Sequence, residues 1–341
     1  MPSADALRAL FGRRLEQGVR GSPLTRLAAA AWEAWSGRAV ARPLSLPAGV
    51  RVVGVGGAVL GGAGKTPVAV ALARAFAERG ERVALVGHAY RAHPGRPRVV
   101  RPDDRVGVVG DDALAAARLL AGAVEVIVAP GRQAALDHAA ALGHRLLVVD
   151  ALLQSAPRRL SAAVLVLDGL APWGAGACPP LGDLRAPPGA LLQAADGVAV
   201  LQPEGTAPSA GVPEGAIPVR SRILGAISPT GQALDLRALG GLRLGLFLAV
   251  ARPDRVVASL ARAGIRPEVI VRLADHAIPS EEILAQAGKR PVEAWLTTAR
   301  CATKLPEAIG GRPVLALDHR VDVADLVGCL AADWGTAEGP C

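Results

Sequence analysis

The residues best suited to chemistry form a glycine-rich loop, Gly61-Gly62-Ala63-Gly64-Lys65-Thr66-Pro67. The loop follows an apolar run and opens a segment of helical character, which is the setting that a phosphate-binding loop requires. Glycines let backbone N–H groups turn towards phosphate oxygens, and the helix N-terminus adds a partial positive charge. Lys65 would neutralise the β and γ phosphates of ATP, and the Thr66 hydroxyl would hold Mg²⁺. The loop therefore predicts binding of ATP and Mg²⁺.

These glycines also allow two other interpretations. The strict phosphate-loop pattern has a glycine where this chain has Val59, so a glycine-rich turn with a chance Gly-Lys-Thr is one alternative. Gly54, Gly56 and Gly57 suggest a dinucleotide-binding loop, but their spacing does not fit Gly-x-Gly-x-x-Gly followed by a helix. The apolar run before the loop and the helical segment after it favour nucleotide binding.

The elements that position this loop alternate between strand and helix. We expect strands over 50–55, 82–86, 124–128, 145–149 and 163–167, and helices over 65–79, 112–121 and 132–142. Such alternation implies a parallel sheet wound by right-handed crossovers. The predicted fold class is α/β, with a P-loop NTPase-like parallel sheet flanked by helices and a smaller C-terminal α/β subdomain.

The distribution of glycine and proline predicts where the domains divide. Stretches rich in both residues, 170–188 and 202–218, are expected to be loops, and a boundary is expected near residue 220. Beyond it we expect a β-like stretch over 219–236, a strand over 242–250, a helix over 253–263 and a last unit ending in 321–333. The predicted organisation is an N-terminal segment 1–46, a P-loop domain 47–220 and a C-terminal domain 221–341.

Composition narrows the class of partner. The chain is 51% hydrophobic but only 3% aromatic, as expected for parallel strands buried between helices. Its net charge of +8 favours an acidic partner, but no zinc-finger spacing, RNA-binding aromatic signature or basic repeat points to nucleic acid. An acidic small-molecule or lipid substrate is expected instead. The cysteines are far apart, which predicts neither a zinc site nor a disulfide framework and suits a reducing cytoplasm: Cys178, Cys301, Cys329 and Cys341.

The first 46 residues are basic and amphipathic. This segment contains seven arginines but only three acidic residues, and leucines and tryptophans are interleaved with them, such as Leu24, Leu27, Trp32 and Trp35. Helices of this kind lie in a membrane interface. The alternative is a helix packed on the protein's own core, and the sequence leaves both open. No stretch of about 20 apolar residues free of charge suggests a membrane span.

Several motifs, in order along the chain, are similar to those of the tetraacyldisaccharide 4′-kinases. Residues 54–67 resemble that family's GNLTVGGTGKTP signature, which also lacks the early glycine. Further segments match the family's motifs in turn: 85–91 lies at LSRGYG, 110–112 at GDEP, 129–132 at APxR, 150–155 at DDGLQH, 180–187 at PAGPLREP, 247–255 at FAGIGNPER, 274–276 at PDH and 296–304 at MTEKDAVK. The resemblance covers roughly residues 20–320.

The resemblance implies a reaction and a set of working residues. The family transfers the γ-phosphate of ATP to the 4′-hydroxyl of a disaccharide lipid, a step in lipid A biosynthesis. It implies that Asp111 is the base, paired with His276 from the second domain, and that Lys65 acts on the phosphates. It also places Asp112 near the metal, where the family has a glutamate. Asp150 ends an apolar strand, where a Walker B carboxylate reaches Mg²⁺ or its water.

The resemblance also implies residues that contact the substrate and a location in the cell, and for some of these residues other roles stay open. Tyr90, Arg132 and Arg185 are candidates for substrate contact, although both arginines suit a solvated or salt-bridged role as well. Asp111 and Asp112 could also simply cap a helix. The expected partner is an acylated disaccharide phosphate, reached at the cytoplasmic face of the inner membrane of a Gram-negative bacterium, with the N-terminal segment making peripheral membrane contact.

The chain departs from the family's motifs at several positions. The second aspartate of DDG is Ala151 and its final histidine is Ser155, the first three residues of SRGY read Gly87-His88-Ala89, and the Lys-Asp of TEKD reads Ala299-Arg300. One alternative is therefore a relative that binds nucleotide but has lost or changed phosphotransfer. Another is an ATPase of the ParA/MinD kind, a group that usually carries a lysine where this chain has Leu60.

Overall fold

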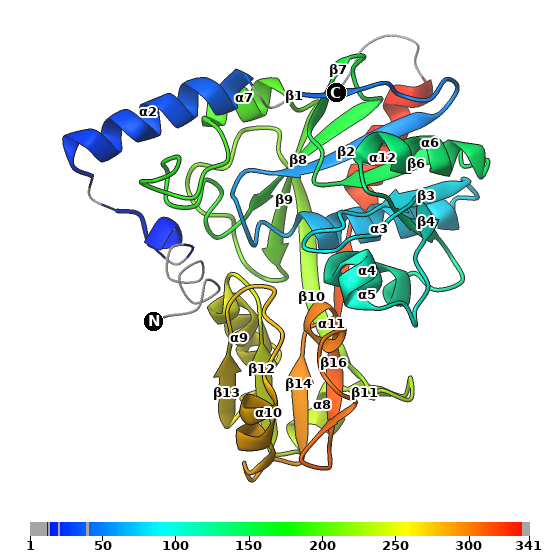
Figure 1. Ribbon diagram of the computed structural model, residues 1–341. Helices are drawn as coiled ribbons and strands as arrows, with labels where there is room; N and C mark the ends of the chain where they lie inside the picture. The colour runs from blue at the N-terminus through cyan, green and yellow to red at the C-terminus, as the bar shows by residue number, and fades with distance from the viewer. Residues whose placement is uncertain (1–11, 13, 20, 39–40, 336–341) are drawn as a thin grey trace. The chain divides into compact units, whose positions relative to one another are not determined.

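The computed structural model describes residues 12, 14–19, 21–38 and 41–335 and divides into two compact units. The larger unit contains residues 12–220 and the chain from 321 onwards, and the smaller unit contains residues 221–320. The chain passes between them twice, within strands β10 (Ile217–Ile227) and β16 (Arg312–Asp322) (Figure 1). About a third of the amphipathic segment expected over 1–46, including Arg8, Arg13 and Arg20, lies outside the described residues.

The larger unit is built on a parallel sheet. In spatial order its strands are β9 (Gly197–Pro203), β8 (Ala162–Asp168), β2 (Arg51–Gly57), β6 (Leu146–Asp150), β3 (Val83–Val86), β5 (Glu125–Val128) and β4 (Arg98–Val99). Neighbouring strands run parallel from β8 to β5, and only the short edge strand β4 is antiparallel to its neighbour. The predicted α/β class and the parallel sheet are confirmed, and each strand and helix expected between residues 50 and 170 is present.

Each face of this sheet has its own hydrophobic core because successive residues of a strand point to opposite sides. Within β6, Val148 belongs to one cluster and Val149 to the other. The first cluster is completed by α3 (Lys65–Glu78), α4 (Val106–Val109), α5 (Asp111–Leu119) and α12 (Ala324–Gly335). The second is completed by α6 (Arg132–Ala141) and α7 (Pro188–Gln193). Helices therefore cover both faces, as the composition predicts.

Helix α2 (Pro23–Arg38) lies on the outside of the larger unit. Ala29 and Ser36 are buried, and the indole N–H of Trp32 donates to the carbonyl of Arg185 at 3.3 Å. The helix leads into β1 (Ala41–Leu44), which pairs in parallel with β7 (Gln154–Pro157) as a separate two-stranded sheet. Among the described residues no helix is both long enough and apolar enough to cross a membrane.

The smaller unit has its own parallel strands and cores. Strands β13 (Val269–Arg272), β12 (Leu244–Leu248), β14 (Ala294–Thr297) and β16 run parallel, with β10 next to β16. The short strand β11 (Ala233–Asp235) pairs antiparallel with β10, and the short strand β15 (Ala308–Ile309) pairs antiparallel with β16. The helices are α8 (Leu236–Gly240), α9 (Pro253–Arg262), α10 (Glu281–Gly288) and α11 (Ala299–Ala302).

The last helix does not belong to the smaller unit, which differs from the expected domain 221–341. Leu326, Val327 and Leu330 of α12 are buried in the cluster beneath α3, and the ring of Trp334 lies 5.3 Å from that of Phe76. The apolar face of α12 thus completes the core of the P-loop unit. Sequence periodicity shows that such a face exists but not which element covers it.

Candidate functional site

The glycine-rich loop joins β2 to α3 and leaves the start of that helix open. Gly62 and Gly64 have φ of 64° and 78°, the left-handed region that glycine enters without steric cost. Gly64 is the N-cap of α3 and no side chain caps the helix. A Cβ at Gly64 would lie 2.2 Å from Leu201 Cδ2, so a larger residue would also collide with the neighbouring strand. The uncapped amides and the helix dipole form a phosphate-binding cradle.

Val59 occupies the position of the missing early glycine, and its surroundings explain the difference. Its side chain is buried in the core, and its backbone forms a bridge with Leu184. On either side, Leu60 N–H donates to Asp183 O and Arg185 N–H donates to Ala58 O, both at 2.8 Å. The loop is therefore anchored to residues 183–185, and the same pairing carries Arg185 to the loop.

Asp150 lies at the carboxyl end of β6, adjacent to β2 in the sheet. The residue is only 4% exposed, and its Oδ2 accepts a hydrogen bond from Thr66 Oγ1 at 2.6 Å. Within the described part of the chain its Oδ1 has no hydrogen-bond partner. A buried carboxylate oxygen beside the loop threonine suits a hard cation, because Mg²⁺ prefers oxygen ligands and keeps several waters. The residues present therefore fit Mg²⁺.

Arg132 supports this carboxylate from behind. Its guanidinium donates to Asp150 O at 2.8 Å and to Ala151 O at 3.1 Å, which fixes the backbone where β6 ends. Ala151, at the position of the family's second aspartate, has φ of 58°. A left-handed alanine costs roughly 1–2 kcal/mol, so the turn is held by its surroundings.

A group of basic side chains surrounds Asp150. Burial lowers the pKa of Arg185, Arg42 lowers it further, and Asp150 opposes both effects. Burial likewise lowers the pKa of Arg132, again opposed by Asp150. Desolvation lowers the pKa of His88 below its usual value, and Arg132 adds to this. The positive charges are close enough to disfavour one another, so the site is suited to an anionic ligand.

Asp111 and Asp112 form the first turn of α5, and the residue that caps this helix is Gly110. Asp111 is buried, and its Oδ1 accepts from Asp112 N–H at 3.0 Å. Neither aspartate is the N-cap residue itself, but the bond from Asp112 N–H to Asp111 satisfies one N–H group of the first turn, so Asp111 also stabilises the start of the helix. A Cβ at Gly110 would lie 3.3 Å from Ala89 Cα, so the segment that carries Tyr90 packs against this turn.

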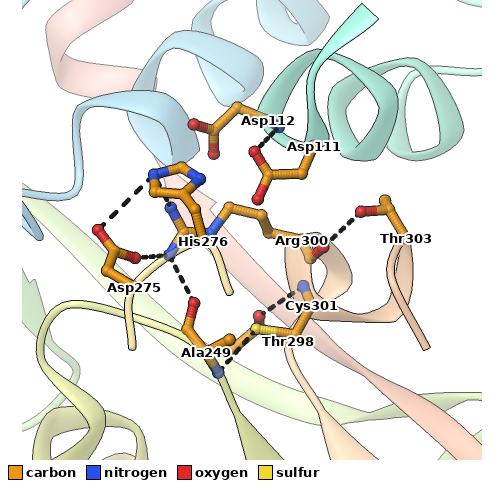
Figure 2. Close-up of polar contacts among 9 residues, drawn as sticks. All are labelled: Asp111, Asp112, Ala249, Asp275, His276, Thr298, Arg300, Cys301 and Thr303. Carbon is orange, nitrogen blue, oxygen red and sulfur yellow. Dashed lines mark hydrogen bonds and ion pairs between the residues drawn. The ribbon is translucent and has the colours of Figure 1, made fainter. Parts of the chain in front are cut away.

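His276 belongs to the smaller unit, where residues from other parts of the same unit hold it (Figure 2). Its backbone N–H donates to Ala249 O at 3.2 Å, and its φ is 60°. Arg300 contacts its Nε2 at 3.0 Å and also forms an ion pair with Asp275 at 2.6 Å. The pairing of Asp111 with His276 joins the two units and stays a prediction.

The structure thus gathers most of the predicted residues of the larger unit at the carboxyl end of its parallel strands. Ligands bind at this edge in open α/β sheets. Sequence reasoning missed Arg42, and it treated His88 and Arg300 only as departures from a motif. Because His88 and Arg300 lie within motifs of the family, their positions could have marked them as candidate site residues. Arg42 lies in β1, a strand that the sequence analysis did not expect.

A parallel sheet whose first loop cradles phosphate, with a buried strand-end carboxylate on the loop threonine, defines a P-loop nucleotide-binding protein. Comparison with known families makes the assignment specific. Residues 22–330 match the profile of the family described as Tetraacyldisaccharide-1-P 4′-kinase. The chain belongs to this family, which confirms the resemblance seen in the motifs and disfavours the ParA/MinD interpretation.

Individual relatives agree with this assignment. The chain is 35% identical over 228 residues to the tetraacyldisaccharide 4′-kinase of Acidithiobacillus ferrooxidans, covering 65% of this chain and 67% of that protein. It is 32% identical to the enzyme of the same name from Chromobacterium violaceum, covering 76% and 75%. The corresponding values for the Methylobacterium sp. enzyme are 33%, 82% and 83%.

One solved structure has the same fold. The "apo" form of LpxK from Aquifex aeolicus, crystallised in complex with ATP, superposes with a TM-score of 0.65. The match covers 91% of this chain and 97% of that one at 18% sequence identity. At this identity the likeness establishes the architecture, and roles of individual residues rest on the geometry above.

Proposed function

We propose that this protein transfers the γ-phosphate of ATP to the 4′-hydroxyl of a tetraacyldisaccharide 1-phosphate, a step of lipid A biosynthesis. The observation that carries the proposal is the 2.6 Å hydrogen bond between Thr66 and buried Asp150 beside an uncapped phosphate loop, in a chain that belongs to this kinase family. Gly61 to Pro67 would enclose the phosphates, with the Lys65 ammonium on the β and γ groups.

Thr66 and Asp150 would hold Mg²⁺, with Asp112 as a further carboxylate. When bound, the ion would neutralise charge that develops on the transferred phosphoryl group. The protein's own contribution is to hold oxygen ligands at a fixed strand end. The clamp from Arg132 to the carbonyls of Asp150 and Ala151 serves that purpose.

Asp111 would accept the proton of the attacking hydroxyl, with His276 as its partner. A buried carboxylate in the first turn of α5 is shielded from water, which suits a general base. Tyr90 and Arg185 are proposed to contact the lipid substrate, because Tyr90 is exposed next to the Asp111 turn and Arg185 is carried to the loop. Arg132 would act mainly through Asp150.

The lipid substrate also requires contact with a membrane, which we assign to α2. Leu24, Leu27, Ala31 and Trp35 are exposed and recur at helical spacing, and the first, second and fourth are 79%, 69% and 62% exposed. The opposite side of the helix carries the buried Ala29 and Ser36. A stripe of this kind fits a helix lying in the bilayer surface, at the cytoplasmic face of the inner membrane in a Gram-negative bacterium.

Transfer of labelled γ-phosphate to a tetraacyldisaccharide 1-phosphate tests the proposal. We expect Mg²⁺-dependent transfer by the purified protein and its loss in Lys65→Ala and Asp111→Ala. Lys289→Ala is the matched control because Lys289 is exposed beyond the end of α10 in the smaller unit. Failure of the wild-type protein to phosphorylate the lipid would contradict the proposal.

A second candidate function is nucleotide binding without this transfer. Ala151 and Ser155 favour it, because the family has a carboxylate and an imidazole at these positions, and Ser155 Oγ instead bonds to the carbonyl of Arg158. Binding of ATP with no transfer to any acylated disaccharide phosphate would make this candidate the better one.

A further inference from the structure

Arg300 forms a fork that reaches three groups of the smaller unit (Figure 2). Its Nη1 lies 3.0 Å from His276 Nε2, and its Nη2 donates to Asp275 Oδ1 at 2.6 Å and to Ala249 O at 3.3 Å. These contacts to His276, to the adjacent Asp275 and to Ala249 fix the orientation of the guanidinium plane. This arginine stands where the family's TEKD motif has its aspartate.

Hydrogen bonds also hold the backbone that carries Arg300. This residue belongs to the one-turn helix α11, whose N-cap Thr298 accepts a hydrogen bond from Cys301 N–H at 3.1 Å. Buried Cys301 in turn accepts from Ala249 N–H through its Sγ at 3.3 Å. The carbonyl of Ala249 receives both the Arg300 fork and the backbone N–H of His276. Arginine and histidine thus share one anchoring residue.

The chemistry of the two side chains decides which atom carries the imidazole proton. A guanidinium has N–H donors and no acceptor. A 3.0 Å contact to His276 Nε2 is therefore a hydrogen bond only if that nitrogen offers its lone pair. The proton of the neutral ring then resides on Nδ1, because the bond made by one ring nitrogen sets the state of the other.

Asp275 could in principle impose the opposite tautomer by accepting a proton from Nε2. Its Oδ2 is 3.6 Å from that nitrogen, which is too long for a hydrogen bond. Its other oxygen is engaged by Arg300 at 2.6 Å. The geometry thus favours the arginine as the partner of Nε2.

We infer that Arg300 is a positioning residue that holds His276 as the Nδ1–H tautomer, so that the guanidinium occupies the Nε2 lone pair and Nδ1 is the nitrogen that carries the proton of the neutral ring. The assignment of the tautomer stands on the smaller unit alone. Its catalytic meaning rests on the proposed function, in which Asp111 is the base.

The tautomer can be measured directly in the full-length protein by ¹⁵N NMR of its imidazoles. His276→Asn identifies the resonances among the six histidines. We expect the wild-type ring to show a protonated Nδ1 and an unprotonated Nε2 at pH 8, and Arg300→Ala, which removes the donor to Nε2, to lose that pattern. Arg272→Ala is the control, because Arg272 forms an exposed ion pair with Asp254 in the same unit. A protonated Nε2 in the wild-type protein overturns the inference.

Kinetics separate the positioning role from a merely structural one. We expect Arg300→Ala to lower kcat by about 10- to 100-fold, because a misdirected group costs rate more than binding. Its KM for ATP should stay within about twofold, because the phosphate loop belongs to the larger unit. An unchanged kcat in a variant that has lost the tautomer pattern would overturn the catalytic meaning. A wild-type protein without kinase activity would defeat the proposed function and leave the NMR result standing.

Discussion

Ala151 is a left-handed residue at the position of the second aspartate in the DDGLQH motif that residues 150–155 resemble, which makes it the most informative single position to change. Aspartate tolerates the left-handed region better than alanine does, so Ala151→Asp requires no change of backbone. The added carboxylate would lie next to Asp150. We expect the Mg²⁺ concentration for half-maximal ATP binding to fall on the order of tenfold, because cation affinity rises with ligand charge.

Ala151→Gly separates charge from strain in that experiment. Glycine removes the steric cost of the left-handed backbone without adding a metal ligand, and we expect it to raise the free energy of unfolding by about 1 kcal/mol. Its Mg²⁺ dependence should equal that of the wild-type protein. Identical Mg²⁺ curves for the aspartate and glycine variants would show that residue 151 does not face the cation.

His88 provides a prediction about pH. Desolvation, and then Arg132, lower the pKa of His88 in the folded protein. The unfolded chain, with a histidine pKa of about 6.5, therefore binds more protons than the folded one at mildly acidic pH. That difference lowers the free energy of unfolding as the pH falls through and below about 6.5. In His88→Asn we expect a smaller loss of stability between pH 7 and pH 5, measured by urea denaturation. His93→Asn is the control.

Some of these residue features were predictable and some were not. Lys65, Thr66 and Asp150 follow from the order of strand, loop and helix, because that order fixes where the chain must turn. The hydrogen bonds of Arg132 to two carbonyls do not follow, since nothing in an arginine-rich sequence distinguishes an arginine that binds phosphate from one that supports a strand end. The conformation of Ala151 is equally invisible, because alanine carries no turn signal.

At the scale of elements, α2 combines a packed side with an exposed apolar stripe. We expect Leu27→Ser with Trp35→Ser to weaken sedimentation with anionic phospholipid vesicles by about tenfold or more, since burying such side chains contributes roughly 1.5–3 kcal/mol each. Ala30→Ser, an exposed position outside the stripe, should bind as the wild-type protein does. Equal binding by all three proteins would argue against α2 as the membrane contact.

Helix α12 shows where element-level prediction stops. Its amphipathic pattern predicts a helix near the correct position, yet the expected domain 221–341 placed it with the wrong neighbours. Its apolar side is covered by α3, a helix that lies some 250 residues earlier in the chain. Contacts between such distant segments depend on the surface each element leaves uncovered, which local patterns do not encode.

At the scale of the whole molecule, the described residues of the smaller unit form one uninterrupted stretch, 221–320, inserted into the larger unit. It has two hydrophobic clusters of its own, around Leu246 and Trp295. We expect residues 221–320, expressed alone, to unfold cooperatively in urea and to give a dispersed amide NMR spectrum. A fragment without a cooperative transition would show that this unit depends on the rest of the chain.

The position of α12 also has a consequence for biosynthesis. Domains tend to fold in order as the ribosome delivers them, at about 5–20 residues per second. The stretch from 221 to 320 takes roughly 5–20 s to synthesise at that rate, and α12 emerges only afterwards. Until then the apolar side chains of α3 that α12 covers lack their final packing partner. We therefore expect the nucleotide-binding unit to complete its core only after the whole insertion has been translated, long after its phosphate loop has been made.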